Sequence, residues 1–343
     1  MSPATASPLE SALTTLLLAY GPPGRESGAR AALRRLLRGA GTASEDATGN
    51  LHVHRVGTGP RLLLTAHMDA PGVIVTRSNG TSGAARLAIL GGRRASELVG
   101  AIARFEDGRR ALIGWDRAGA KDGTEPDADA LFLETGAGAK KKDAKRLAVG
   151  DIAAIEDRPN RIGDLWCSAN LDNRAGCAAV VAALRKARRV GFDVHAVFSA
   201  QSDLGARGAT TGAYGVDPEI AVVVDVAHVG DGKETSGFEC GKGPGIVLKE
   251  AAFLAHPDGI ELVRKAARSA RVPLQHLIRE NEGSDARAVR ASRNGVPTAV
   301  IAIPARRTGS AASLVHARDL AQTTDLIVAL LGAASKKRKG GRR

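Results

Sequence analysis

Residues 166–177 read Trp-Cys-Ser-Ala-Asn-Leu-Asp-Asn-Arg-Ala-Gly-Cys, and a run rich in Ala, Val and Leu follows them. This pattern predicts a helix over residues 173–189 that carries the carboxylate of Asp172 at its start. A single Asp at such a position is commonly only a cap, because a carboxylate accepts the first free N–H groups of a helix. The role of Asp172 therefore depends on which residues the fold brings beside it.

Polar residues stand at or just past the ends of three other apolar, strand-like runs. They are His67-Met68-Asp69, Gln201-Ser202-Asp203 and Asp225. In open α/β sheets, ligands bind at the carboxyl ends of the strands. We therefore expect these side chains to meet Asp172 at one edge of a sheet.

The order of apolar patterns predicts an α/β fold with a largely parallel sheet that is covered by helices on both faces. Two scaffold helices and two strands come first, and from residue 163 helices and strands alternate. The predicted helices cover residues 9–19, 29–37, 173–189, 206–214, 259–269 and 319–331, and the predicted strands cover 51–54, 61–66, 194–199, 220–226 and 296–303.

Between about residues 76 and 162 the pattern changes to short strand-like runs separated by Gly-rich and charged turns. Such a pattern is typical of a small β-rich module. Because His67 precedes it and Asp172 follows it, residues 76–162 are predicted to be inserted into an α/β domain made of residues 1–75 and 163–332. A short helix is expected at 144–149, and residues 333–343 are expected to form a disordered basic tail.

Composition limits the class of protein. The 343 residues, 43% of them hydrophobic, suffice for one large or two moderate domains. The three cysteines show no CxxC spacing, which argues against a disulfide framework and favours a reducing cytoplasm. No stretch near residue 1 combines a basic region, an apolar core and a small-residue cleavage site, and no apolar run approaches the roughly 18–20 residues of a membrane span, so we expect a soluble, unexported protein.

The formal net charge of +13 lies largely in the tail and in residues 140–145. Charge runs of this kind are usually solvated. Aromatic residues make up only 3% of the chain, so the stacking platforms of single-strand binders are scarce. These features argue against nucleic-acid binding as the main function and leave nonspecific contact by the tail as an alternative.

His67, Asp172 and Asp225 are the kind of donors that a catalytic zinc-like ion takes, three protein ligands with one position left open. Asp69, two residues beyond His67 on an extended segment, can accept the second ring N–H of that histidine. Each signal is weak alone, since a lone His-x-Asp occurs by chance and an Asp at a strand end is often a turn former. His52 and His54 alternate on a strand with one exposed face, and we assign them no chemistry.

Several short motifs follow one another in a specific order along the chain. They are Gly49-Asn50, Leu63-Leu64-Thr65-Ala66-His67-Met68-Asp69-Ala70-Pro71-Gly72, Leu90-Gly91-Gly92, Glu134-Thr135-Gly136-Ala137, Val149-Gly150-Asp151, Leu171-Asp172-Asn173-Arg174-Ala175-Gly176-Cys177, Gln201-Ser202-Asp203-Leu204-Gly205-Ala206-Arg207-Gly208-Ala209, Asp225-Val226-Ala227-His228, Gly241-Lys242-Gly243-Pro244, Gly283-Ser284-Asp285-Ala286 and Gly295-Val296-Pro297-Thr298. With them, residues 9–332 resemble the cytoplasmic deblocking or glutamyl-type metallo-aminopeptidases, di-metal enzymes that form tetrahedral particles. The resemblance implies that His67, Asp172 and Asp225 form one metal site, that Asp172 bridges to a second metal, and that the inserted module is a dimerisation domain.

The sequence departs from this family at three functional positions. Ser202 and Asp203 stand where the family carries two glutamates, the first a general base and the second a ligand of the second metal. A serine hydroxyl stays protonated at neutral pH and cannot replace the base, whereas Asp203 keeps a carboxylate that can ligate. Gly309 aligns with the histidine that is the second metal's remaining ligand, and His316, further along, is a poor substitute. A complete di-metal site is therefore not expected.

Two main hypotheses follow. In the first, the protein is a hydrolase of peptide N-termini whose rate is lower by a factor of about 10²–10⁴, because the usual base is absent. It holds about one divalent ion, zinc in preference to cobalt or manganese, and Asp203 deprotonates the water. In the second, a non-catalytic relative keeps the fold and one metal to bind a peptide or to assemble. The intact first metal set favours the hydrolase, and a basic carrier that binds nucleic acid through its tail is the third alternative. We expect a peptide or aminoacyl substrate and a homo-oligomer formed through residues 76–162.

Overall fold

The computed structural model describes residues 7–78, 84–118, 121, 123–136, 147–230, 237–280, 282–310 and 312–333. Most of the predicted basic tail and residues 144–146 of the predicted short helix lie outside these ranges, and residues 147–150 contain no helix. Within the described ranges, every helix is too short or too polar to span a lipid bilayer.

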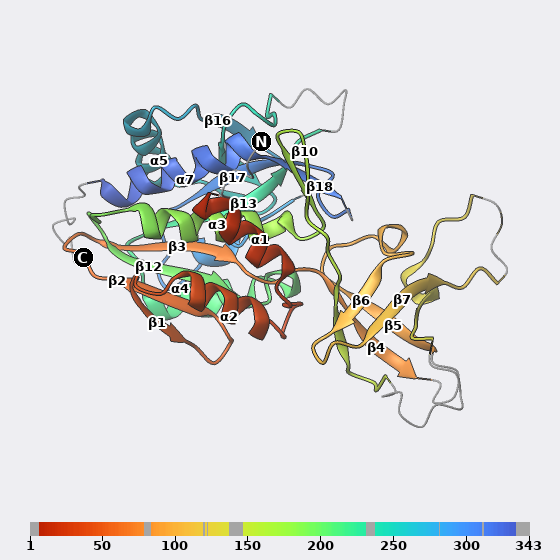
Figure 1. The fold of residues 1–343 in the computed structure, drawn as a ribbon. Helices are drawn as coiled ribbons and strands as arrows, with labels where there is room; N and C mark the ends of the chain where they lie inside the picture. The colour runs from red at the N-terminus through yellow and green to blue at the C-terminus, as the bar shows by residue number, and fades with distance from the viewer. Residues whose placement is uncertain are drawn as a thin grey trace, which may run out of the picture.

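A large sheet forms the centre of the main domain, and four strands in its middle run parallel (Figure 1). They are β12 (Asp193–Ser199), β3 (Arg61–His67), β13 (Ile220–His228) and β17 (Thr298–Arg306), in that order across the sheet. Crossover connections that contain helices join these strands, as parallel pairing requires. This arrangement confirms the predicted α/β class.

Antiparallel strands extend both sides of this parallel centre, so the sheet as a whole is mixed. On one side lie β2 (Leu51–Arg55) and β1 (Thr42–Glu45), and on the other lie β18 (Ser313–His316), β11 (Leu165–Ser168) and β10 (Asn160–Ile162). A branch from β17 adds β14 (Gly245–Glu250), β15 (Phe253–Leu254) and β16 (Gln275–Ile278). Among the described strands, the largely parallel pairing that we predicted is thus found in the centre and between β14 and β16 of the branch.

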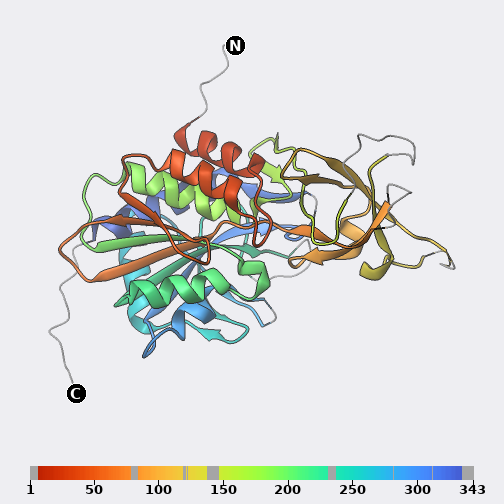
Figure 2. The same ribbon diagram turned by 90° about the horizontal axis from the view of Figure 1, so that it is seen from below.

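Helices cover both faces of the sheet, as Figure 2 shows. One face carries α1 (Pro8–Leu18), α2 (Ser27–Leu36), α3 (Leu171–Lys186), α5 (Pro257–Ala270) and α7 (Ala317–Gly332), and the other carries α4 (Arg207–Val216) and α6 (Ala286–Arg290). Strand β13 shows why the central strands are apolar throughout. Val222 and Val224 pack on the first face while Ala221 and Val223 pack on the second, because successive side chains of a strand point to opposite faces.

A small closed β-barrel lies beside the main domain in both views. Its strands are β4 (Gly72–Ser78), β5 (Ala84–Leu90), β6 (Ile102–Phe105), β7 (Arg110–Trp115), β8 (Leu131–Glu134) and β9 (Ile152–Ile155), with single 3-10 turns at Ala95–Glu97 and Ala128–Ala130. The barrel has its own apolar core.

The barrel's limits differ from the predicted insertion of residues 76–162. Residues 72–75 already belong to the barrel, because Gly72 and Val73 pair with both β5 and β9. At the other end, β10 pairs with β11 and thereby joins the large sheet. The pattern of short apolar runs did not show where the chain leaves the barrel and joins the large sheet, because both sheets contain strands of similar length.

Candidate metal centre

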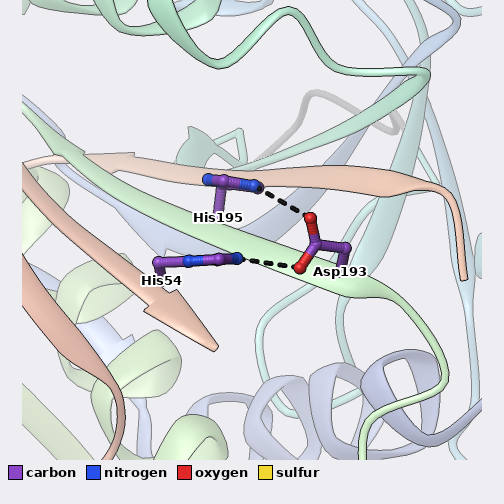
Figure 3. A group of neighbouring side chains, drawn as sticks. All are labelled: His54, Asp193 and His195. Carbon is purple, nitrogen blue, oxygen red and sulfur yellow. Dashed lines mark hydrogen bonds and ion pairs between the residues drawn. The ribbon is translucent and has the colours of Figure 1, made fainter. Parts of the chain in front are cut away.

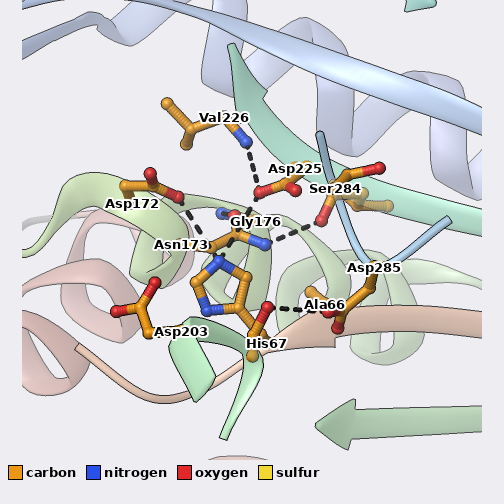
Figure 4. A network of polar contacts seen from close by, with 12 residues as sticks. Ala66, His67, Asp172, Asn173, Gly176, Asp203, Asp225, Val226, Ser284 and Asp285 are labelled. Carbon is orange, nitrogen blue, oxygen red and sulfur yellow. Dashed lines mark hydrogen bonds and ion pairs between the residues drawn. The ribbon is translucent and has the colours of Figure 1, made fainter. Parts of the chain in front are cut away.

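Three predicted donors meet at the carboxyl end of the central strands (Figure 4). His67 ends β3, and Asp225 reaches the same level of β13 because Val223 pairs with Thr65 in a parallel register. His67 Nε2 lies 3.4 Å from Asp172 Oδ1 and 3.7 Å from Asp225 Oδ1. A tetrahedral zinc site with bonds of 2.0–2.2 Å places its donor atoms about 3.3 Å apart. The three side chains therefore fit one divalent ion.

Asp172 is free to face this centre because the next residue caps the helix. Asn173 Oδ1 accepts the N–H of Gly176 at 3.1 Å, and its amide donates to the Val224 carbonyl at 2.8 Å. A side chain at Gly176 would collide with Asn173 Oδ1, so glycine is required there. The Asp172–Asn173 peptide bond is cis, and both residues have non-helical backbone angles. The capping role that Asp172 could have had thus belongs to Asn173.

Asp69 supports His67 and holds the neighbouring loop. Its carboxylate is fully buried, and Oδ1 lies 3.3 Å from His67 Nδ1. The carboxylate also accepts the backbone N–H groups of Ser202 at 3.1 Å and Asp203 at 3.0 Å, at the start of the 3-10 turn Ser202–Leu204. Burial opposes ionisation, but His67 and these two N–H groups keep the pKa of Asp69 below its usual value.

The centre carries more negative charge than its one histidine can neutralise. Burial opposes a charged ring, yet the carboxylates of Asp172, Asp69 and Asp225 raise the pKa of His67 well above its usual value. For Asp225, burial itself raises the pKa well above the usual range for a carboxyl, because a buried carboxylate loses its hydration. A cation that binds here would therefore have to displace protons from the cluster.

The side chain of Ser202 is held by a hydrogen bond to Asp285. Its hydroxyl donates to Asp285 Oδ1 at 2.7 Å, and Asp285 Oδ2 accepts the hydroxyl of Ser199 at the same distance. Asp285 is buried, and burial raises its pKa. We did not predict a role for Asp285 from sequence, because it follows no strong apolar strand pattern; its only signal was the motif Gly283-Ser284-Asp285-Ala286.

Asp203 keeps an unengaged carboxylate oxygen beside the donors. Figure 4 shows it on the Asp172 side of the His67 ring, and its Oδ2 is buried without a hydrogen-bond partner in the described residues. Burial and the nearby Asp69 raise the pKa of Asp203 to about 7. Gly91 leaves room for this carboxylate, since a Cβ there would lie 2.7 Å from Asp203 Oδ2. Asp203 is therefore a group that can take up a proton at this site.

Arg93 brings a protein cation close to the carboxylates of Asp172 and Asp203. Its guanidinium is buried and donates to the carbonyls of Gly309 at 3.0 Å and Ser310 at 2.5 Å. Burial lowers the pKa of Arg93, while the charges of Asp172, Glu97 and Asp203 oppose this shift. Sequence reasoning missed Arg93, because it stands in a Gly- and Arg-rich turn without periodicity.

His316 lies at the start of a helix and caps it. Its Nδ1 accepts the N–H of Arg318 at 3.1 Å and so caps α7, and its ring packs beside Gly241. The structure thus brings His67, Asp172, Asp225, Asp69 and Asp203 together, and places His316 in a capping role.

Comparisons with known proteins identify the family. The model of the M42 glutamyl aminopeptidase family matches residues 49–326, and the chain therefore belongs to this family. An Acetivibrio thermocellus protein, provisionally assigned as an aminopeptidase, is 30% identical over 285 residues, covering 82% of this chain and 86% of its own. The lysyl aminopeptidase of Pyrococcus furiosus is 29% identical over 299 residues, covering 83% and 85% of the two chains. The solved structure of an aminopeptidase from the archaeon Desulfurococcus kamchatkensis matches with a TM-score of 0.89, 27% identity and 95% coverage of both chains.

Proposed function

We propose that the protein is a metal-dependent aminopeptidase-type hydrolase that works with one divalent ion held by His67, Asp172 and Asp225. The observation that carries this proposal is the convergence of these three donors, whose ligand atoms all lie within 4.8 Å of one another. Zinc suits one imidazole and two carboxylates, and cobalt and manganese are alternatives. When bound, such an ion polarises a carbonyl and lowers the pKa of a coordinated water.

The surroundings support one ion in place of two. A second ion would need further ligands at positions 203 and 309, and Gly309 offers no side chain. Arg93 places its positive charge beside Asp172 and Asp203 and binds the carbonyl of Gly309. A second dication there would be repelled by the guanidinium in a buried environment, where charges interact strongly.

Asp203 takes the role of proton acceptor in this proposal. Its Oδ2 is buried and has no hydrogen-bond partner among the described residues, whereas the Ser202 hydroxyl already donates to Asp285. Asp203 accepts a proton from the attacking water and returns it to the leaving amine, so the proton balance closes over one turnover. Asp69 orients His67 and, through two N–H groups, holds the backbone of residues 202 and 203. We propose a peptide N-terminus or an aminoacyl compound as the substrate, because the chain belongs to an aminopeptidase family.

A second candidate function is a non-catalytic relative that binds a peptide or assembles. The observation that favours it is the position of Ser202, whose hydroxyl is locked to Asp285 where the family has its base. Activity measurements on metal-reconstituted protein separate the two functions. Aminoacyl p-nitroanilides and dipeptides should be cleaved slowly with added zinc, cobalt or manganese, and Asp203→Asn should remove this activity because an amide is no base.

Two further variants complete this test. Ser202→Glu should raise the rate, because it returns a carboxylate to the position of the missing base. Ser202→Ala is the matched control and should leave the rate of the wild type nearly unchanged. If the wild type shows no turnover while Ser202→Glu combined with Gly309→His gains it, the non-catalytic function holds.

We also propose that the chain self-associates through the barrel. Ile102 and Leu112 face each other across β6 and β7, and their side chains remain exposed, as does that of Val99. We call Val99, Ile102 and Leu112 the barrel patch. Exposed apolar side chains gathered in this way are typical of protein–protein contact, and the resemblance to oligomeric aminopeptidases points to a second copy as the partner.

A further inference from the structure

A second group of metal-ligand side chains lies at the opposite end of the sheet from the metal centre. Figure 3 shows it: His54 on β2, and Asp193 and His195 on β12. His195 stands directly opposite His54 in the antiparallel pair, and Asp193, two residues earlier, points to the same face. On β12, Ser199 pairs with His67, so His195 is four residues from that level, roughly 13 Å along the strand. The group is therefore separate from the metal centre.

The geometry of this group suits a cation. The two imidazole rings stack with centroids 4.3 Å apart and planes 12° apart, so both rings direct Nε2 toward one carboxylate. His54 Nε2 lies 2.8 Å from Asp193 Oδ1, and His195 Nε2 lies 3.4 Å from Asp193 Oδ2. These separations bracket the distance of about 3.3 Å between donor atoms around a tetrahedral ion. The ligand atoms of the three side chains all lie within 4.8 Å of one another, and the two rings must turn out of their parallel stack for both nitrogens to reach one ion.

Among the residues that the structure describes, the carboxylate of Asp193 pairs with His54 and His195, and no arginine or lysine lies within ion-pair distance of it. Arg61 pairs with Asp193 in the register of the sheet, but its guanidinium binds the carbonyl and carboxylate of Asp217 at 2.9 and 3.1 Å. In a chain with a net charge of +13, Asp193 thus keeps its charge available for a cation.

We propose that His54, His195 and Asp193 form a second divalent-cation site, for a late first-row ion such as Zn²⁺, Ni²⁺ or Cu²⁺. Imidazole nitrogen suits these ions, and affinity rises toward Cu²⁺ along the series. All three side chains are partly exposed, so the ion can enter from solvent. Bound there, it ties the outer β1–β2 hairpin to the parallel centre and stabilises the fold by mass action. This inference does not rest on the proposed function.

Cu²⁺ electron paramagnetic resonance tests the site directly, because the two centres differ in nitrogen ligands. The metal centre offers one imidazole, His67, whereas the second site offers two. The experiment uses untagged, metal-depleted full-length protein carrying Asp172→Asn, which disables the metal centre, with one equivalent of Cu²⁺ added. We expect coupling to two imidazole nitrogens and a rise in melting temperature with added Zn²⁺ or Ni²⁺.

Variants assign the signal to residues. His54→Ala or His195→Ala, added to Asp172→Asn, should abolish the two-nitrogen signal and the metal-induced rise in melting temperature. His52→Ala is the matched control: His52 lies on the same strand, contacts Asp46 at 3.0 Å, and should leave both readouts unchanged. The melting temperature of each metal-free variant shows that it folds. Absence of the two-nitrogen signal in the Asp172→Asn protein, or its survival in His54→Ala, overturns the proposal.

Discussion

Replacing Asp69 by asparagine tests the residue that contacts His67 while leaving the three proposed metal ligands in place. Asp69 is fully buried, with Oδ1 facing His67 and the N–H of Ser202, and Oδ2 facing the N–H of Asp203. Asparagine has one oxygen and one NH₂ group, so in either orientation at least one of these groups meets a donor instead of an acceptor. The loss of one buried hydrogen bond costs about 1–3 kcal/mol of folding stability.

Metal affinity should fall by a separate amount. Substituting an outer partner of a ligating histidine typically lowers affinity about 10–100-fold, equivalent to about 1.4–2.8 kcal/mol. Competition with a chromophoric chelator measures the affinity, and urea unfolding of metal-free protein measures stability. Because the second proposed site would also bind metal, both measurements use the His54→Ala, His195→Ala background.

Two control variants set the upper and lower limits for this change in affinity. Asp225→Asn removes a direct ligand and should abolish tight binding, since the amide carries no charge. Ser202→Ala should leave affinity unchanged, because the Ser202 hydroxyl bonds Asp285 and contacts none of the three donors. Unchanged affinity in Asp69→Asn, with Asp225→Asn behaving as expected, would refute the assignment of Asp69 as the residue that orients His67.

Three further predictions follow from the same structure. In the His54→Ala, His195→Ala background, elemental analysis after dialysis should find about one divalent ion per chain and none after Asp172→Asn; two ions would contradict the single-ion centre. Leu112→Glu should place a charge in the barrel patch and yield smaller particles in light scattering, and an already monomeric wild type would rule out that interface. Burial opposes ionisation of Asp46, but hydrogen bonds from His52 and Asn50 hold its pKa below the usual aspartate value. Asp46→Asn should therefore lower the free energy of unfolding at pH 7, and urea unfolding should show this difference shrinking as pH falls below the unfolded-state pKa of about 3.9 and through the folded-state pKa.

The local sequence pattern was enough to predict the long helices and strands and the positions of the donors His67 and Asp225. Helix α3 and strands β3 and β13 follow clear apolar periodicities, and the structure confirms them with shifts of a few residues at their ends. His67 and Asp225 were predictable as neighbours because both follow buried runs of parallel strands, whose carboxyl ends share one edge. The short elements β14, β16, β18 and α6 escaped prediction, since four to six residues carry too little periodicity to distinguish helix from strand.

Only the tertiary structure decided which distant side chains share a site. Arg93 reaches the carbonyl of Gly309 through the packing of a barrel-side turn on the main domain, and no local pattern encodes that contact. His54 and His195 become neighbours because β2 pairs antiparallel with β12 in one particular register. A shift of one residue would turn His54 to the opposite face, since side chains alternate along a strand. Donor type can be read from the sequence, but the meeting of donors depends on strand order and register, which non-local packing sets.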